Sequence, residues 1–223
     1  MAVGLHWAPI VRWSLPTLLV QGALSALLFQ DTLLAKHFFS APDAGTYAGL
    51  ATTARILAYG AMALATFLFP VVSRLQVTGV KGRIVTHITL GAVAAGEAVM
   101  LVVYGFFPAK VLAIVVGSQY SAQSALLPLV AIALASYALL TIIVNYLLAS
   151  GKRLFWMILL VAPPLEVVLM GRYHTTLHDF ILVEDLVILA TLSLLLVIYL
   201  TSNVRINRDT GQLLASETIH SAV

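Results

Sequence analysis

Among the ionisable side chains inside the long apolar stretches of this chain, four could bind an anion or carry a coupling ion. They are Asp31, Arg55, Glu97 and Glu166. A charged side chain at the centre of a bilayer costs about 2.5–3.5 kcal/mol on insertion scales, so each of them requires a partner or a function. These four residues are therefore the candidates for a functional site.

Arg55 has the chemistry to hold a phosphate or pyrophosphate group, because its guanidinium can fork to two oxygens. It lies about 11 residues into its apolar stretch, which is roughly 16 Å along a helix and close to the middle of a ~30 Å hydrocarbon core. The alternative is a structural ion pair with Asp31 on the neighbouring stretch. The two roles can coexist, and both require Arg55 to face protein, not lipid.

The carboxylates Asp31 and Glu166 could carry a coupling ion or a proton. Asp31 has a simpler alternative, which is to pair with Arg55 or Lys36, and we favour the pairing. Glu166 follows Pro163-Pro164, which should kink or break its helix. A carboxylate beside unwound backbone forms the cation site of some transporters, and a structural contact at the helix break is the favoured alternative.

Glu97 lies in the middle of its stretch, with no basic residue near it in that stretch. We expect it to be paired across helices, protonated because it is buried, or in contact with water, and it is the second candidate for a functional carboxylate. The small residues beside it favour the close approach of another helix, and they are Gly91, Ala92, Ala95 and Gly96.

For the other polar and aromatic side chains we expect positions that involve no binding site. Glu184 and Asp185 lie about one turn from the outer end of the last stretch, so we expect water to reach them near the headgroups. An aromatic belt at the membrane interfaces explains the large rings near the stretch ends, which are Trp13, Tyr47, Tyr104, Tyr120 and Trp156.

Six apolar stretches must position these side chains, and each is long enough to cross a bilayer. Charged residues make up 9% of the chain and hydrophobic residues 61%, whereas soluble domains carry about 25% charged residues. Unbroken apolar runs of about 20 residues are typical of spanning helices, and they lack the alternation of barrel strands. We therefore predict an all-α integral membrane protein whose six spans cover residues 14–39, 46–70, 84–107, 123–149, 154–171 and 180–201.

The distribution of basic residues predicts the orientation of the spans. Residues 1–13 precede the first span, and residues 202–223 form a polar tail after the last. Eight basic residues lie on the side of the termini, namely Arg12, Arg74, Lys81, Arg83, Lys152, Arg153, Arg205 and Arg208. The opposite side receives three, namely Lys36, Lys110 and Arg172. This bias places both termini in the cytoplasm.

Several functional classes are disfavoured by the motifs that the chain lacks. It contains no Cys, which removes disulfides, thiolate metal sites and Cys nucleophiles. It contains no HExxH zinc motif, GxSxG nucleophile elbow or glycine-rich phosphate loop, so we expect no enzyme, metal site or cofactor. His174 and His178 lie beside Asp179, and solvated loop residues explain this group better than metal ligation. The basic residues lie at span ends, which argues against nucleic acid as a partner.

Two groups of short motifs occur in a distinctive order. The first group reads Asp31, Lys36-His37-Phe38-Phe39, Ala44-Gly45-Thr46-Tyr47-Ala48, Arg55 and Phe69-Pro70-Val71-Val72-Ser73-Arg74. The second group reads Gly117-Ser118-Gln119-Tyr120-Ser121-Ala122, Leu126-Leu127 and Asn145-Tyr146-Leu147-Leu148-Ala149-Ser150-Gly151-Lys152. Each motif is loose by itself, and their order and spacing together make the pattern specific.

These motifs resemble those of polysaccharide-biosynthesis flippases in the multidrug/oligosaccharidyl-lipid/polysaccharide (MOP) exporter superfamily. The first group resembles the Asp late in the seventh helix of such proteins, the aGxYa entry to the eighth helix and its lfPxxSr exit. The second group resembles the GxxYxxAxxLL entry to the tenth helix and the exit of that helix. The resemblance covers about residues 10–155, and residues 173–179 depart from the GxxGAA stretch that often precedes the family's twelfth helix.

The resemblance implies both an architecture and an activity. A complete flippase of this kind has two six-helix lobes around a central cavity, and this chain resembles the C-terminal lobe. The implied activity is the movement of a lipid-linked oligosaccharide or polysaccharide precursor across the cell (inner) membrane by alternating access, with Arg55 holding anionic phosphate. The implied partners are membrane lipids, this substrate, and a complementary six-helix lobe or a second copy. The alternative is a non-transporting membrane scaffold or assembly subunit, such as a truncated half-transporter.

Overall fold

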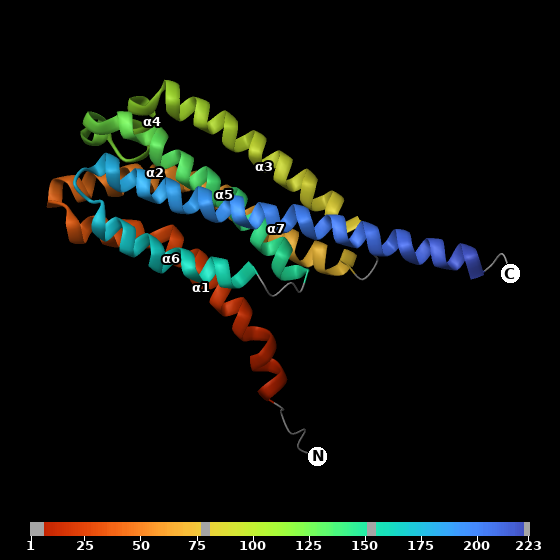
Figure 1. Ribbon diagram of the computed structural model, residues 1–223. Helices are drawn as coiled ribbons and strands as arrows, with labels where there is room; N and C mark the ends of the chain where they lie inside the picture. Colours follow the sequence, from red (N-terminus) through yellow and green to blue (C-terminus); the bar gives the residue numbers. More distant parts are fainter. Residues whose placement is uncertain (1–6, 77–80, 151–154, 221–223) are drawn as a thin grey trace, which may run out of the picture.

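The computed structural model describes the backbone of residues 7–76, 81–150 and 155–220. Side chains are described for residues 14–64, 66, 67, 70, 71, 84–150 and 155–201. The described residues form helices and no strand (Figure 1). The helices are α1 (Trp7–Phe38), α2 (Ala41–Gln76), α3 (Lys81–Phe106), α4 (Pro108–Val115), the 3-10 helix η1 (Ser118–Leu126), α5 (Leu127–Ala149), α6 (Phe155–Arg172) and α7 (Leu177–His220).

Five of the described segments are long and apolar enough to cross a membrane. They are Ser14–Phe38, Ile84–Phe106, Ser118–Ala149, Phe155–Arg172 and Leu177–Thr201. Many of their large apolar side chains are exposed on the surface of the bundle, as expected where the surrounding solvent is lipid. The structure therefore indicates a multi-pass, all-helical membrane protein.

The predicted span 46–70 lies within α2 but is not among these five segments. Part of it falls outside the described side chains, at positions 65, 68 and 69. Its described part carries Tyr47, Thr53 and Arg55, which lower its hydropathy and are all buried against other helices. A sixth span, with the topology that it implies, remains a prediction.

The helix α5 occupies the middle of the bundle. Its residues are buried almost continuously from Leu127 to Leu147, and it packs against α2, α3 and α7. Figure 1 shows α1 and α6 side by side on one side of this central group and α3 on the other. This arrangement brings α1, α2, α6 and α7 close to one another, and these four helices carry most of the candidate residues.

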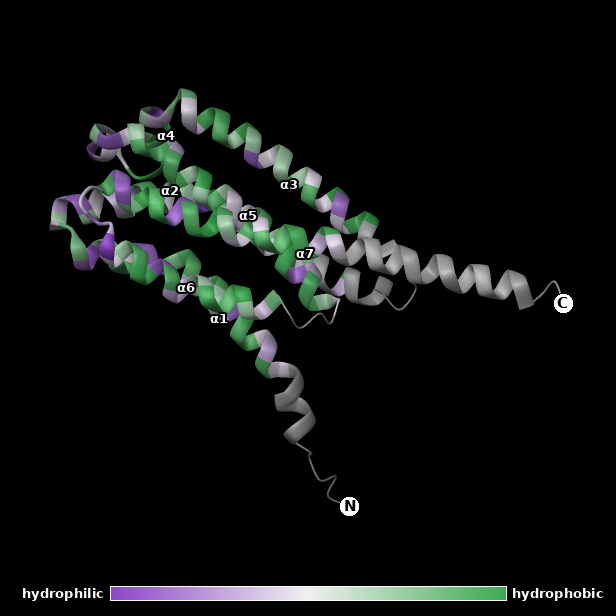
Figure 2. Ribbon diagram, viewed as in Figure 1, coloured by the Kyte–Doolittle hydropathy of each residue, from purple (hydrophilic) through white to green (hydrophobic). Residues whose placement is uncertain are grey.

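Hydrophilic residues gather at one end of the bundle, where three connections lie (Figure 2). Two of these connections begin a helix with a side-chain cap. The Ser40 hydroxyl accepts a hydrogen bond from the backbone N–H of Asp43 at 3.4 Å and donates one to its carboxylate at 2.7 Å. Thr176 makes the same pair of bonds with Asp179 at the start of α7, at 3.1 and 2.9 Å. In each cap the backbone bond satisfies one free N–H group of the first helical turn, and the bond between the two side chains holds the capping hydroxyl in place, which explains why α2 and α7 start where they do.

The expected break at Pro163-Pro164 is not found. Pro163 and Pro164 lie inside α6, which continues as an α-helix from Phe155 to Arg172. The prolines leave the carbonyl oxygens of Leu159 and Leu160 without their helical N–H partners, which a membrane helix can tolerate where neighbouring helices pack against it. Gln30 on α1 donates a hydrogen bond to the carbonyl oxygen of Pro163 at 3.1 Å and so joins α1 to α6 at this point.

The small residues of α3 do not bring another described helix into close contact. A Cβ atom added at Gly91 or Gly96 would meet no neighbouring atom within 4 Å. The only close approach of this kind at a described glycine inside a helix is at Gly49 on α2, where a Cβ atom would lie 3.1 Å from the ring of Tyr120. The close contact therefore joins the two groups of motifs on α2 and η1 instead of involving α3.

Candidate functional site: a buried carboxylate cluster around Arg55

Arg55 is buried in the bundle and forms an ion pair with Asp31 of α1. Its Nη2 atom donates to both oxygens of Asp31, at 2.7 and 2.8 Å, and to the hydroxyl of Thr32 at 2.8 Å. Its Nε atom donates to the carbonyl oxygen of Leu28 at 2.9 Å. The guanidinium therefore faces protein, as both alternatives for Arg55 required, and it joins α2 to α1.

The guanidinium keeps one nitrogen free of hydrogen bonds among the described residues. Nη1 has no such bond, and the side chain of Arg55 is 8% exposed. The guanidinium carbon lies 5.2 Å from the centre of the Phe29 ring, which is itself partly exposed. An Arg held through Nε and Nη2 is pre-organised, and its remaining donors can bind an anion without a further loss of side-chain freedom.

Tyr47 connects this ion pair to a second carboxyl group on α7. Its hydroxyl lies 2.8 Å from Oδ2 of Asp31 and 2.8 Å from Oε2 of Glu184. A phenol has one proton to donate, so it satisfies one ionised carboxylate only. Arg55 pairs with Asp31, which makes Asp31 the ionised acceptor. The second short contact then requires a proton on Glu184.

Glu166 lies in the same region and is held by Gln30 of α1. The Gln30 amide donates to Oε2 of Glu166 at 2.8 Å, and the other oxygen of Glu166 is buried without a hydrogen bond among the described residues. Glu184 is close enough to interact electrostatically with both Glu166 and Asp31.

These residues form a group that we call the carboxylate cluster, defined as Asp31, Glu166 and Glu184 with Arg55 and Tyr47. Its three carboxyl groups are at most 1% exposed, and they come from α1, α6 and α7. One guanidinium cannot neutralise three buried carboxylates, and an uncompensated buried charge is costly. The cluster therefore has to hold protons in addition to Arg55.

Two members of the cluster were not identified from the sequence. Tyr47 was expected in an interfacial aromatic belt, but it is fully buried. Glu184 was expected to meet water, but it is 1% exposed. No periodic signal marks this face of α7 in the sequence, because apolar residues surround Glu184 on all sides of the helix. Its burial follows from the packing of α7 against α5 and α6.

Asp185 and Tyr104 also differ from their expected positions. Asp185 is 7% exposed, and its Oδ1 atom has no hydrogen bond among the described residues. Tyr104 is buried and donates a hydrogen bond to the carbonyl oxygen of Thr53 at 3.0 Å, which links α3 to α2. Trp13 lies outside the described side chains.

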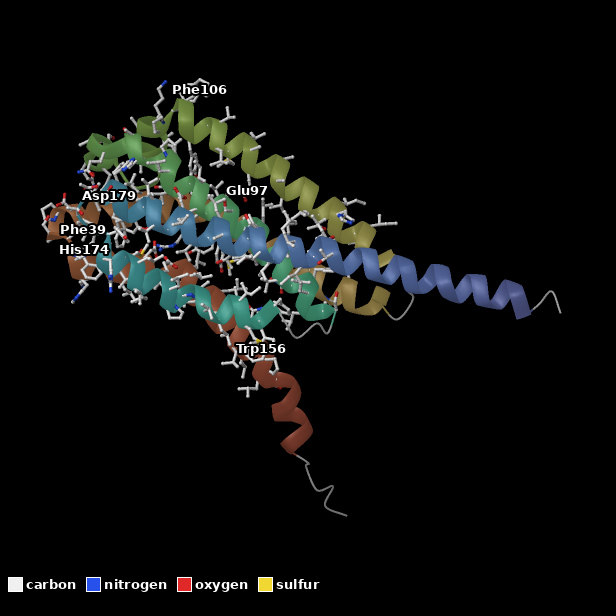
Figure 3. All side chains as sticks on the ribbon, viewed as in Figure 1. Phe39, Glu97, Phe106, Trp156, His174 and Asp179 are labelled. Carbon is white, nitrogen blue, oxygen red and sulfur yellow. The ribbon has the colours of Figure 1, made fainter. Side chains whose placement is uncertain are left out.

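The structure does not bring Glu97 into the carboxylate cluster. Glu97 lies on α3, and Figure 3 shows its side chain on the side of α3 that faces the bundle. It is 8% exposed, and its Oε2 atom has no hydrogen bond among the described residues. The four candidates from the sequence therefore fall into two places, with Asp31, Arg55 and Glu166 together and Glu97 apart.

The histidines of the α6–α7 connection form contacts within the protein. The ring of His174 stacks on Phe38 with 4.3 Å between centroids, and its Nδ1 atom lies 3.2 Å from the carbonyl oxygen of Met170. His178 Nδ1 lies 3.9 Å from Oδ1 of Asp179. Among the side chains that the structure describes, no group of three or more His, Cys, Asp or Glu residues is arranged to hold a metal ion.

Comparisons with models of protein families, with curated proteins and with solved structures give no match to this chain.

Proposed function

We propose that this chain forms one lobe of a membrane flippase, which moves a lipid-linked oligosaccharide or polysaccharide precursor across the cytoplasmic membrane by alternating access. The proposal rests on the environment of the Arg55 side chain. Its guanidinium is buried between α1 and α2, anchored through Nε and Nη2, and makes no hydrogen bond at Nη1 with the side chains and backbone that the structure describes. This arrangement suits the phosphate or pyrophosphate that links a sugar to its lipid.

A polar groove along the same helices supports a sugar-bearing ligand. A cavity of about 280 Å³ lies between α1, α2 and α5, and its walls include Thr17, Gln21, Thr66, Thr141 and Asn145. These side chains are uncharged and can donate and accept hydrogen bonds, as sugar hydroxyls require. Met62 of this groove lies seven residues from Arg55 along α2, or roughly 10 Å. A phosphate at Arg55 and a sugar in the groove would then belong to one ligand.

The carboxylate cluster supplies a means to couple transport to a cation. Asp31 holds Arg55, and Tyr47 ties Asp31 to the protonated Glu184. A proton that enters or leaves the cluster therefore changes the charge beside Arg55. The expected consequence is a change in how strongly Arg55 holds an anion, which is the kind of linkage that alternating access needs.

A second lobe is the expected partner, either a complementary six-helix chain or another copy of this one. Large apolar residues of α1 are exposed on either side of the buried Arg55 contact, and they include Leu18, Phe29 and Leu33. Alternating access requires two bodies that move around a shared cavity. We place the second body against this face of α1 and α2.

The test is transport of a fluorescent polyprenyl-diphosphate-linked sugar in membrane vesicles from cells that express the chain. Arg55→Lys keeps a positive charge beside Asp31 but loses the paired N–H donors that let a guanidinium bind two phosphate oxygens at once. We therefore expect transport to fall about tenfold or more at normal expression. The double variant Arg55→Gln with Asp31→Asn removes both charges together, and we expect it to abolish transport while the bundle persists.

Two outcomes would overturn the proposal. Unchanged transport in both variants would remove Arg55 from the mechanism. Absence of transport by the unaltered chain, with its partner present, would favour the alternative of a non-transporting scaffold, in which Arg55 and Asp31 only join α1 to α2.

A further inference from the structure

Glu97 lies in a groove that the proposed transport site does not use. The groove runs between α2 and α3 and has a volume of about 320 Å³. Arg55 reaches from α2 toward α1, whereas this groove lies where α2 faces α3. Glu97 is the one charged side chain among the described residues that line it.

The walls of the groove are apolar and open. Its described lining includes Leu57, Gly60 and Ala61 on α2 and Val93, Gly96 and Met100 on α3. A Cβ atom added at Gly60 or Gly96 would meet nothing within 4 Å, so the two helices do not close against each other there. Ile56 and Leu64 at the rim are 42% and 47% exposed, which leaves a path from the surrounding lipid.

The carboxyl group of Glu97 lacks a hydrogen-bond donor or counter-charge among the described residues of this groove. Its Oε2 atom is buried and makes no hydrogen bond among the described residues, and no described basic side chain lines the groove. A buried carboxyl without a partner is costly in either charge state, because it loses water without gaining a hydrogen bond or a counter-charge. A ligand that carries a positive charge would supply what the protein lacks.

From these observations we propose that the groove between α2 and α3 binds an amphiphilic monovalent cation, such as a lipophilic quaternary ammonium or phosphonium ion. The cationic centre lies against the Glu97 carboxylate, and its hydrocarbon groups lie on the apolar walls. The volume is at the lower end of the range of small-molecule sites. An anionic amphiphile of the same shape is excluded, because a buried carboxylate repels it. This inference is independent of the proposed transport function.

Binding of radiolabelled tetraphenylphosphonium to the purified chain in lipid nanodiscs tests this site. Tetraphenylborate has nearly the same shape and the opposite charge, so it controls for simple partitioning into lipid. We expect saturable binding of the phosphonium ion and none of the borate. Glu97→Gln should weaken phosphonium binding about tenfold or more, because it removes the counter-charge and keeps the size of the side chain.

Two further variants separate a binding site from a folding defect. Gly96→Leu fills the groove without touching the carboxylate, and we expect it to weaken phosphonium binding about as much as Glu97→Gln. Asp179→Asn removes a partly exposed carboxylate in the first turn of α7 and should leave binding unchanged. Equal binding of the borate, full binding by both groove variants, or no saturable phosphonium binding by the unaltered chain would each overturn the proposal.

Discussion

The hydroxyl of Tyr47 lies 2.8 Å from a carboxyl oxygen of Glu184, although the two residues are 137 positions apart in the chain. The same hydroxyl lies 2.8 Å from Asp31, which holds Arg55. One phenol thereby joins α1, α2 and α7 at a buried point. This contact converts a simple ion pair into a group whose charge can change.

Loss of the Tyr47 hydroxyl should destabilise the bundle moderately. Tyr47→Phe leaves the ring in place but removes the partner of two buried carboxyl groups, and we expect a loss of about 1–2 kcal/mol. Thermal unfolding in detergent, followed by circular dichroism, measures this change. Tyr59→Phe is the matched control, because Tyr59 is on the same helix, is 49% exposed and has no hydrogen bond to another described residue. Equal losses in the two variants would contradict the proposed bridge.

The Arg55–Asp31 pair should behave as a coupled unit. Arg55→Leu leaves Asp31 buried without its counter-charge, and we expect a loss of about 3–5 kcal/mol in the free energy of unfolding. The double variant with Asp31→Leu removes both charges and should recover most of that loss. A double-mutant cycle measures the coupling. Additive losses would show that the two side chains do not depend on each other.

Amide substitutions should distinguish the two carboxyl groups at Tyr47. Glu184→Gln keeps a donor and an acceptor beside Tyr47, so we expect a cost below about 1 kcal/mol if Glu184 carries the shared proton. Asp31→Asn removes the counter-charge of Arg55 and should cost about 3 kcal/mol or more. Denaturation of the two variants under the same conditions gives the comparison. A larger loss from Glu184→Gln would place the proton on Asp31 instead.

Gly49 should tolerate no branched side chain, because the Tyr120 ring occupies the space that a Cβ atom needs. A Cβ atom there would lie 3.1 Å from that ring, so we expect Gly49→Val to cost about 1–3 kcal/mol by overpacking. Gly45→Ala on the same helix meets nothing within 4 Å and should raise stability by about 0.4–1 kcal/mol. Adding Tyr120→Leu to Gly49→Val should restore stability, and failure to do so would assign the loss to the backbone of α2.

Thiol labelling should establish the orientation, because the chain has no cysteine to interfere. Ser40 follows Phe39, and Figure 3 shows Phe39 and Asp179 at the same end of the bundle, so we expect Ser40→Cys and Asp179→Cys both to react with a membrane-impermeant reagent added to intact cells. Lys152→Cys, in a connection outside the described residues, should react only after the cells are permeabilised. The reverse pattern would invert the predicted topology.

The membrane character of the chain followed directly from its sequence. Hydropathy is a property of each residue and its neighbours, so runs of about 20 apolar residues identify helices before any packing is known. The bounds of α3, α6 and the apolar part of α7 accordingly lie within about three residues of the predicted spans. The sequence also identified Arg55 and Asp31 as possible partners, because a buried charge needs one and few were available.

Only the tertiary structure decided which buried groups meet. The sequence could not place Tyr47 beside Glu184 or Gln30 beside Glu166, because those contacts depend on how each helix is rotated and which helices are neighbours. It also could not show that Glu97 lies apart from the cluster, because a carboxylate in the middle of an apolar stretch has the same neighbouring residues in sequence whichever helix it faces. Local composition determines that a helix lies in the membrane, whereas the packing of helices far apart in the chain determines the partner of each charge.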